Sequence, residues 1–285
     1  MLSRLRRNAY SEDGTGPVGR RTSGPALRSS KEKRELSEAT KRSRLPSTVD
    51  LRPRLASVGL EVRCQKPRGA CSVFTFVGAI EYALSMKAPI GRLSVEFANW
   101  ASNAAKDEKD DGDFFCNLLK GFEQHGICLE CQMPYRAKFD PDLEPSAAAL
   151  ETAGWAKRQG IAFHWLKSTH FEPGLTREQF LNVKRVIASG WPVLGGFCWT
   201  KKPAWKYDNM INYYPRKDMI LDSGGHSMLL VGYANDNTHP GGGVFILRDS
   251  GDGKCGYMPY AHARDYLMDH GWFDFGEPLE YPVRT

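Results

Sequence analysis

The segment that most constrains the fold is the run CSVFTFVGAIEYALSM, which spans residues 71–86. Apolar side chains would cover nearly every face of a helix formed by this run, so we predict a central helix that is buried on all sides. Gly69 and Ala70 precede the run, and their small size lets the chain turn sharply into the helix. A chain of 285 residues is long enough to bury such a helix in a substantial core.

The residues around the start of this helix suit a nucleophilic site. Cys71 would be the first helical residue, where the helix dipole and free backbone N–H groups favour a thiolate. Gln65 lies six residues earlier, and its uncharged amide could bind an oxyanion together with the backbone N–H of Cys71. His226, far downstream in a strand-like context, could serve as the base, and Asp249 could fix the orientation of its ring.

The N-terminal part of the chain differs from the rest in composition. Residues 1–45 are rich in Arg, Ser, Gly and Lys and nearly lack aromatic residues, so we predict a disordered tail with at most a short helix over 31–41. This tail holds twelve Lys or Arg and five Asp or Glu, which leaves 27 basic and 28 acidic residues for the remainder. A basic tail could contact nucleic acid or anionic lipid, although a solvated extension is the simpler interpretation.

The order of the predicted elements indicates the fold class. Further helices are expected over 95–104, 114–125, 141–153 and 175–189, and short strands over 193–199, 227–233 and 244–248. Helices first and strands later predict an α+β protein with two lobes.

The cysteines and the N-terminus bear on the cellular compartment. Seven cysteines are present, and an odd number is compatible with a free thiol. The basic start of the chain has no apolar stretch behind it, and no apolar run reaches 18 residues. We therefore expect a cytoplasmic protein without a membrane span.

Several motifs occur in the order typical of papain-like cysteine peptidases, and the chain resembles the bacterial branch of this family over residues 45–275. They are Leu45–Arg52, the run from Gln65 to Cys71, Leu93–Glu96, Asp111–Asp113, Gly126–Glu130 before Pro134-Tyr135, Gly224–His226, Ile246–Ser250 and Gly256–Tyr260. The resemblance implies a two-lobe fold, in which a helical lobe carries the central helix that starts at the catalytic cysteine and the other lobe is an antiparallel β-sheet or barrel. It also implies a catalytic domain over 46–285, with a mainly helical part at 46–150, a mainly β part at 151–260 and a C-terminal segment, 261–285, returning over the lobes.

The same resemblance implies a substrate cleft between the lobes and a peptide or protein substrate. Gly69, Gly112, Asp113 and Gly225 would line the substrate-binding side, and Asp113 could favour a basic partner. Catalysis would pass through an acyl-enzyme thioester and would need no metal or organic cofactor.

Four positions depart from the family pattern. Asp249 stands where relatives carry Asn, Gly251 where an aromatic residue usually shields the histidine contact, and Ser72 where Trp is frequent. Arg68 replaces a half-cystine of the secreted members, which favours a reduced setting. These departures leave the Cys–His pair intact, but they keep open a weakly active or inactive peptide-binding protein.

Three other interpretations stay open. An acyl transferase would use the same site with an amine as acceptor. A nucleic-acid-binding protein would act through residues 1–45. A zinc site at Cys128 and Cys131, with His125 and Cys116 nearby, is a weaker hypothesis because no second C-x2-C pair follows at the usual spacing.

Overall fold

The computed structural model describes residues 45–284 except 170, 203 and 207. The predicted basic tail therefore lies outside the described residues apart from Leu45, as does the short helix expected over 31–41. Residues 45–285 form one compact unit. The finer division of this unit at residues 150 and 260 stays a prediction.

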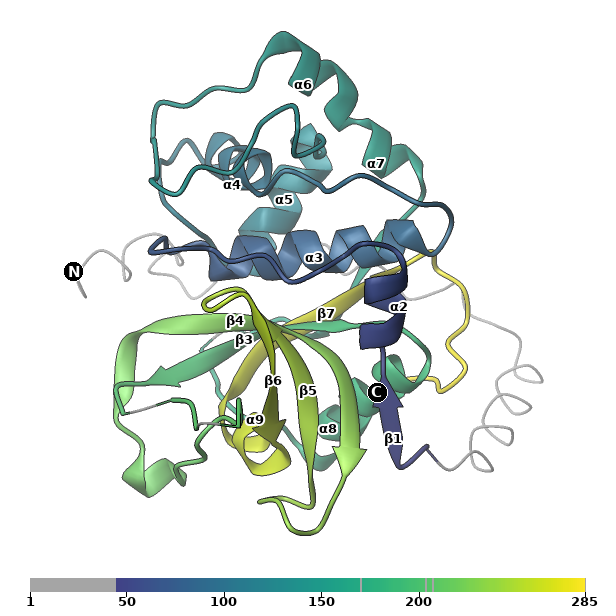
Figure 1. The fold of residues 1–285 in the computed structure, drawn as a ribbon, viewed down its shortest axis with the longest axis vertical. Helices are drawn as coiled ribbons and strands as arrows, with labels where there is room; N and C mark the ends of the chain where they lie inside the picture. Colours follow the sequence, from purple (N-terminus) through teal and green to yellow (C-terminus); the bar gives the residue numbers. More distant parts are fainter. Residues whose placement is uncertain (1–44, 170, 203, 207, 285) are drawn as a thin grey trace, which may run out of the picture. The chain divides into compact units, whose positions relative to one another are not determined.

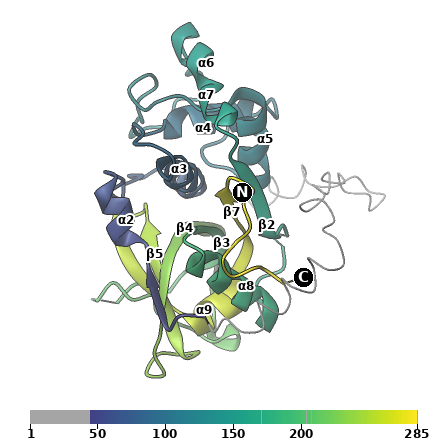
Figure 2. The ribbon, with the colours of Figure 1, turned by 90° about the vertical axis from the view of Figure 1, so that its right-hand side faces the viewer.

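The central helix α3, Cys71–Ser85, lies between a group of helices and a β-sheet (Figure 1). All of its residues after Cys71 are buried, as the apolar run predicts. In Figure 2 the helix is seen along its axis, with α4 and α5 on one side and the sheet on the other. Phe76 illustrates this position, because its ring lies 6.3 Å from that of Phe122 on α5 and 5.3 Å from that of Phe273 on β7.

Four further helices follow α3 before the main strands begin. They are α4 (Val95–Ala104), α5 (Phe115–His125), α6 (Ala147–Ala153) and α7 (Trp155–Arg158). The Ser94 hydroxyl caps α4 by accepting the backbone N–H of Phe97 at 2.9 Å. The helix α5 ends at Gly126, whose φ of 79° suits a glycine. The helices expected over 95–104 and 114–125 are thus confirmed, and that expected over 141–153 begins later, at Ala147.

The sheet has seven antiparallel strands. They are β1 (Thr48–Asp50), β2 (Ala162–Lys167), β3 (Val193–Thr200), β4 (Leu221–Asn235), β5 (Gly243–Asp249), β6 (Lys254–Pro259) and β7 (Leu267–Asp274). Their spatial order is β2-β7-β3-β4-β5-β6, with β1 paired to β4. The predicted α+β class is confirmed, and the three expected strands correspond to β3, β4 and β5.

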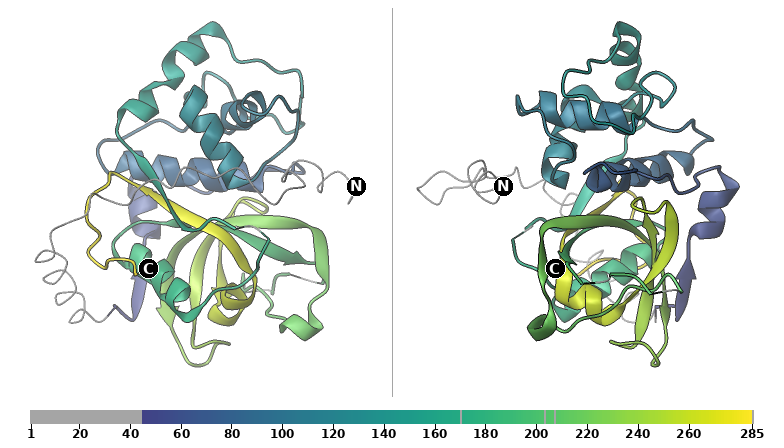
Figure 3. Two further views of the ribbon diagram at one scale, coloured as in Figure 1. Left: turned by 180° about the vertical axis from the view of Figure 1, so that it is seen from behind. Right: turned by 60° about the vertical axis from the view of Figure 1, so that its left-hand side comes forward.

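The face of the sheet away from α3 encloses a second core. It is covered by α8 (Arg177–Ala188) and α9 (Tyr260–Tyr266), and Figure 3 shows the strands curving around these helices. Phe180 on α8 packs against Phe245 and Tyr260, with ring centroids 5.6 and 5.0 Å apart. Two short elements complete the described fold, α2 (Arg52–Ser57) and the 3-10 helix η1 (Arg216–Asp218). No described helix has both the length and the apolarity needed to cross a bilayer.

Candidate active site

Cys71 is the first residue of α3, where its sulfur meets free backbone N–H groups. Burial alone would raise the pKa of the Cys71 thiol, but a hydrogen bond to His226 and the charge of that ring outweigh it. The backbone amides of Ser227 and Ser72 act in the same direction, so the pKa lies below its ordinary value. The structure thus brings together Cys71 and His226, which lie 155 residues apart in the sequence.

His226 lies on β4 and Asp249 ends the neighbouring strand β5. The Nε2 atom of His226 is 2.6 Å from Oδ1 of Asp249, whose side chain is only 2% exposed. Burial would lower the pKa of His226, but the contacts with Asp249 and Cys71 raise it well above the ordinary value. Because Nε2 faces Asp249, Nδ1 is the nitrogen left to share a proton with the Cys71 sulfur.

Gln65 is held in one orientation by contacts along its length. The Ser250 hydroxyl donates to Oε1 at 2.7 Å, and Nε2 donates one hydrogen to the Arg68 carbonyl, also at 2.7 Å. The Gln65 backbone is fixed as well, because its N–H bonds to the Ser250 carbonyl and its carbonyl accepts the Tyr135 hydroxyl. Within the described part of the chain, Nε2 has no second acceptor, so one hydrogen can bind a further acceptor, as an oxyanion donor requires.

Trp199 is a residue of this site that the sequence pattern did not reveal. Its ring centroid lies 4.7 Å from that of His226, with the two planes tilted by 52°. Gly251 has no side chain to shield the histidine contact, as noted from the sequence, and its backbone N–H donates to Asp249 at 3.1 Å. Trp199 on β3 supplies an aromatic neighbour for the imidazole from another strand, and the register that pairs Phe197 with His226 brings it there.

The glycines expected on the substrate side make close backbone contacts. A Cβ on Gly112, which has a φ of +85°, would lie 2.1 Å from the Gly69 carbonyl oxygen. A Cβ on Gly69 would lie 2.8 Å from the Asp111 carbonyl, and one on Gly225 would lie 3.0 Å from that of Phe197. Only glycine fits Gly112, because both the space and the backbone conformation exclude a side chain.

Asp113 has partners within the protein. Its carboxylate forms an ion pair with Lys106 at 2.7 Å and accepts hydrogen bonds from Ser102 and Asn117. Its side chain is 6% exposed. We therefore expect Asp113 to tie α4 to α5 rather than to offer a free charge to a basic substrate.

Arg68 anchors the loop between Gln65 and Cys71. Its guanidinium is 2% exposed and lies 2.6 Å from Glu96 and 2.8 Å from Asp111. It also lies over the ring of Tyr135, 4.6 Å from the centroid. An ionic contact thus occupies the position of the half-cystine noted above, and all seven cysteines of the chain are free thiols.

No metal centre accompanies this site among the described residues, where no three His, Cys, Asp or Glu side chains are arranged to hold an ion. Of the C-x2-C pair, Cys128 is buried and Cys131 is exposed.

Solved structures share this fold. Xylellain, a cysteine protease from Xylella fastidiosa, aligns over 83% of this chain and 88% of its own, with 21% identity and a TM-score of 0.63. The digestive procathepsin L 3 of Tenebrio molitor larval midgut aligns over 81% of this chain and 71% of its own, with 20% identity and a TM-score of 0.54. The cysteine protease CMS1MS2 of Carica candamarcensis, solved in complex with E-64, aligns over 81% and 99%, with 18% identity and a TM-score of 0.53.

The chain therefore has the fold of the papain-like cysteine proteases, as the sequence resemblance predicted. No protein-family model and no curated protein sequence matches it.

Proposed function

We propose that this protein is a papain-like cysteine peptidase that cleaves peptide or protein substrates. The observation that carries the proposal is the position of His226, which hydrogen-bonds to Asp249 at 2.6 Å and to Cys71 on its other side. A buried carboxylate, an imidazole and a thiol at a helix start form the chain of groups that activates a sulfur nucleophile. The shared fold of solved cysteine proteases supports the same conclusion.

The proposed reaction follows from these contacts. The Cys71 thiolate attacks the substrate carbonyl carbon, and the resulting oxyanion accepts hydrogen bonds from the Cys71 backbone N–H and the free hydrogen of Gln65 Nε2. His226 then gives its proton to the leaving amine, the C–N bond breaks, and a thioester forms. Water, deprotonated by His226, attacks the thioester and releases the acid and the thiolate. Every proton that leaves one group is accepted by another, so the reaction needs no reactant besides the substrate and water.

Labelling with an epoxysuccinyl peptide tests the proposal, because this electrophile needs an activated thiol. We expect wild-type protein to be labelled at Cys71, with labelling lost in Cys71→Ala and strongly slowed in His226→Ala. The exposed thiol of Cys116 offers a matched control, since Cys116→Ala should label like wild type. Labelling that survives undiminished in His226→Ala would contradict the thiolate–imidazolium pair.

Hydrolysis of a fluorogenic peptide library then separates peptidase from binder. A protein that alkylates well below pH 7 but releases no fluorophore would favour the peptide-binding alternative, whereas an added amine that captures the acyl group would favour a transferase. A cytoplasmic location stays a prediction, as does nucleic-acid binding through residues 1–45.

A further inference from the structure

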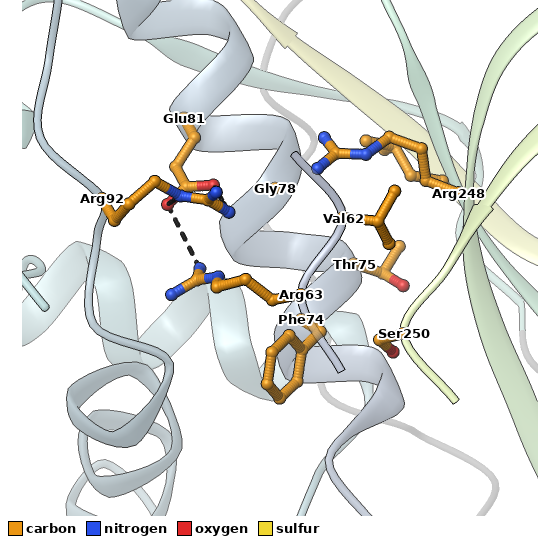
Figure 4. Close-up of a pocket in the computed structure, with 10 residues that line it drawn as sticks. Val62, Arg63, Phe74, Thr75, Gly78, Glu81, Arg92, Arg248 and Ser250 are labelled. Atoms are coloured by element: carbon orange, nitrogen blue, oxygen red, sulfur yellow. Dashed lines mark hydrogen bonds and ion pairs between the residues drawn. The ribbon is translucent and has the colours of Figure 1, made fainter. Parts of the chain in front are cut away.

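A small cavity lies beside α3, on the side where the loop around Val62 passes between this helix and β5 (Figure 4). Its volume is about 30 Å³. Three arginines line it, Arg63, Arg92 and Arg248, together with Glu81, Gly78 and Thr75. The cavity is separate from the groups that would perform the reaction, although Ser250 borders it.

Glu81 forms ion pairs with two of the three arginines. Its side chain is 1% exposed and lies 3.1 Å from Arg63 and 3.0 Å from Arg92, and it also accepts the backbone N–H of Leu93 at 2.8 Å. Arg63 has a second acidic partner in Glu130, at 3.1 Å, on the more exposed side. Oε1 of Glu81 accepts hydrogen bonds from Arg63, Arg92 and Leu93, and Oε2 accepts one from Arg92, so the single negative charge of Glu81 is shared between two arginines.

Of these three arginines, Arg248 has no acidic partner among the described residues. Its Nη2 atom donates to the carbonyls of Leu60 and Glu61 at 2.8 and 2.9 Å. Its Nη1 atom is buried and has no hydrogen-bond partner in the described part of the chain, and the residue as a whole is 8% exposed. Figure 4 shows this guanidinium reaching from β5 toward Gly78 and Val62. A buried charged donor without a partner is destabilising, so this position favours a bound ligand.

We propose that this cavity binds a single monatomic anion such as chloride, with Arg248 Nη1 as its principal donor. An anion there would compensate the positive charge that Glu81 leaves unpaired. Burial and the charges of Arg92 and Arg63 lower the pKa of Arg248 to about 10, which is consistent with an excess of positive charge at this point. The cavity has room for at least one water-sized particle. A monatomic anion is favoured because one buried charged donor, Arg248 Nη1, is without a partner in the described chain, whereas sulfate and phosphate need several donors.

The site has a direct structural connection to the proposed active site. Arg248 immediately precedes Asp249, which contacts His226, and Ser250, which holds Gln65. An anion bound to Arg248 would restrain the C-terminal end of β5, next to Asp249 and Ser250. This consequence rests on the proposed peptidase function, whereas anion binding itself does not and can be measured without any activity assay.

Sodium bromide is the probe, because bromide resembles chloride and gives an anomalous X-ray signal. We expect crystals grown in bromide to show an anomalous peak in contact with Arg248 Nη1. In solution, the Tm should rise by roughly 5–10 °C when bromide reaches about 100 times its Kd, relative to sodium gluconate at equal ionic strength.

Two variants separate binding from fold stability. Gly78→Ala adds a methyl group to the cavity wall, and its Cβ would meet Leu229 at an ordinary 3.7 Å, so the helix should gain stability while the bromide response is lost. Arg248→Met should also abolish the response, whereas Arg54→Met, on exposed α2, should keep it. A bromide-independent Tm, no anomalous peak at Arg248, or an equal response in wild type and Gly78→Ala would each overturn the proposal and leave water as the occupant.

Discussion

The substitution Asp249→Asn should shift the alkaline limb of catalysis to lower pH. In the native protein the carboxylate lies 2.6 Å from His226 Nε2 and is 2% exposed, so solvent screens this contact little. Asparagine keeps an oxygen that can accept the imidazole N–H, and it therefore preserves the orientation of the ring. The substitution removes the charge alone.

The size of the shift follows from Coulomb's law. Two unit charges roughly 4 Å apart interact by about 4 kcal/mol at an effective dielectric constant of about 20. One pKa unit corresponds to about 1.4 kcal/mol, so the pKa of His226 should fall by roughly two to three units. His226 must be protonated to release the leaving amine, and the activity should disappear at a correspondingly lower pH.

The assay is kcat/KM for a fluorogenic peptide between about pH 4 and 10, a range that spans the ordinary pKa values of carboxylates, imidazole and thiols. Asp252→Asn is the matched control, because Asp252 lies in the same turn but its side chain is 60% exposed and pairs with Lys254. We expect Asp252→Asn to keep the wild-type profile. An alkaline limb that does not move in Asp249→Asn would refute the claim that the carboxylate sets the basicity of His226.

The same pair makes stability depend on pH. The pKa of His226 is raised, so its stabilising contribution is complete below its unfolded value of about 6.5 and is lost as pH rises through the folded pKa. Burial would raise the pKa of Asp249, but the hydrogen bond and charge of His226 lower it below its ordinary value. Its contribution is therefore present above about 3.9 and is lost as pH falls through the folded pKa. Urea unfolding should therefore show the largest wild-type advantage over Asp249→Asn between about pH 4 and 6.5.

Three further predictions concern groups around the site. Gln65→Ala should lower kcat by about 10²–10³ through loss of an oxyanion donor, while the rate of Cys71 alkylation stays unchanged. Trp199→Ala should lower kcat/KM by exposing the imidazole to water, and Trp199→Phe should restore most of it; equal losses in both variants would argue against shielding. Arg68→Met should destabilise the fold by about 3–5 kcal/mol in urea unfolding, because it leaves Glu96 buried without its cation. A loss below about 1 kcal/mol, the usual worth of an exposed ion pair, would contradict that reasoning.

The parts of the fold that the sequence predicted well depend on local patterns. The run after Cys71 is apolar on every side, and α3 is buried on every side. In the structure Ser94 caps the start of α4 and Gly126 follows the last residue of α5, and such capping is decided within one helical turn.

The features that were missed depend on pairing between distant segments. Trp199 reaches His226 only because β3 and β4 are neighbours, and no local pattern around Trp199 indicates that. The strands β2 and β7 carry polar residues among their apolar ones, so neither was expected. Asp113 looked like an available charge, since its partners Lys106, Ser102 and Asn117 become visible only when α4 and α5 pack together.

The place of β7 in the sheet has a consequence for biosynthesis. This strand is formed by residues 267–274, yet it lies between β2 and β3 and carries Phe273 into the core against α3. A ribosome delivers residues in order, so β2 and β3 cannot pair with their common neighbour until residues 267–274 have been made. Until then the nascent polypeptide would hold Cys71 and His226 on an incomplete sheet, so the proposed active site could form only after β7 has been synthesised.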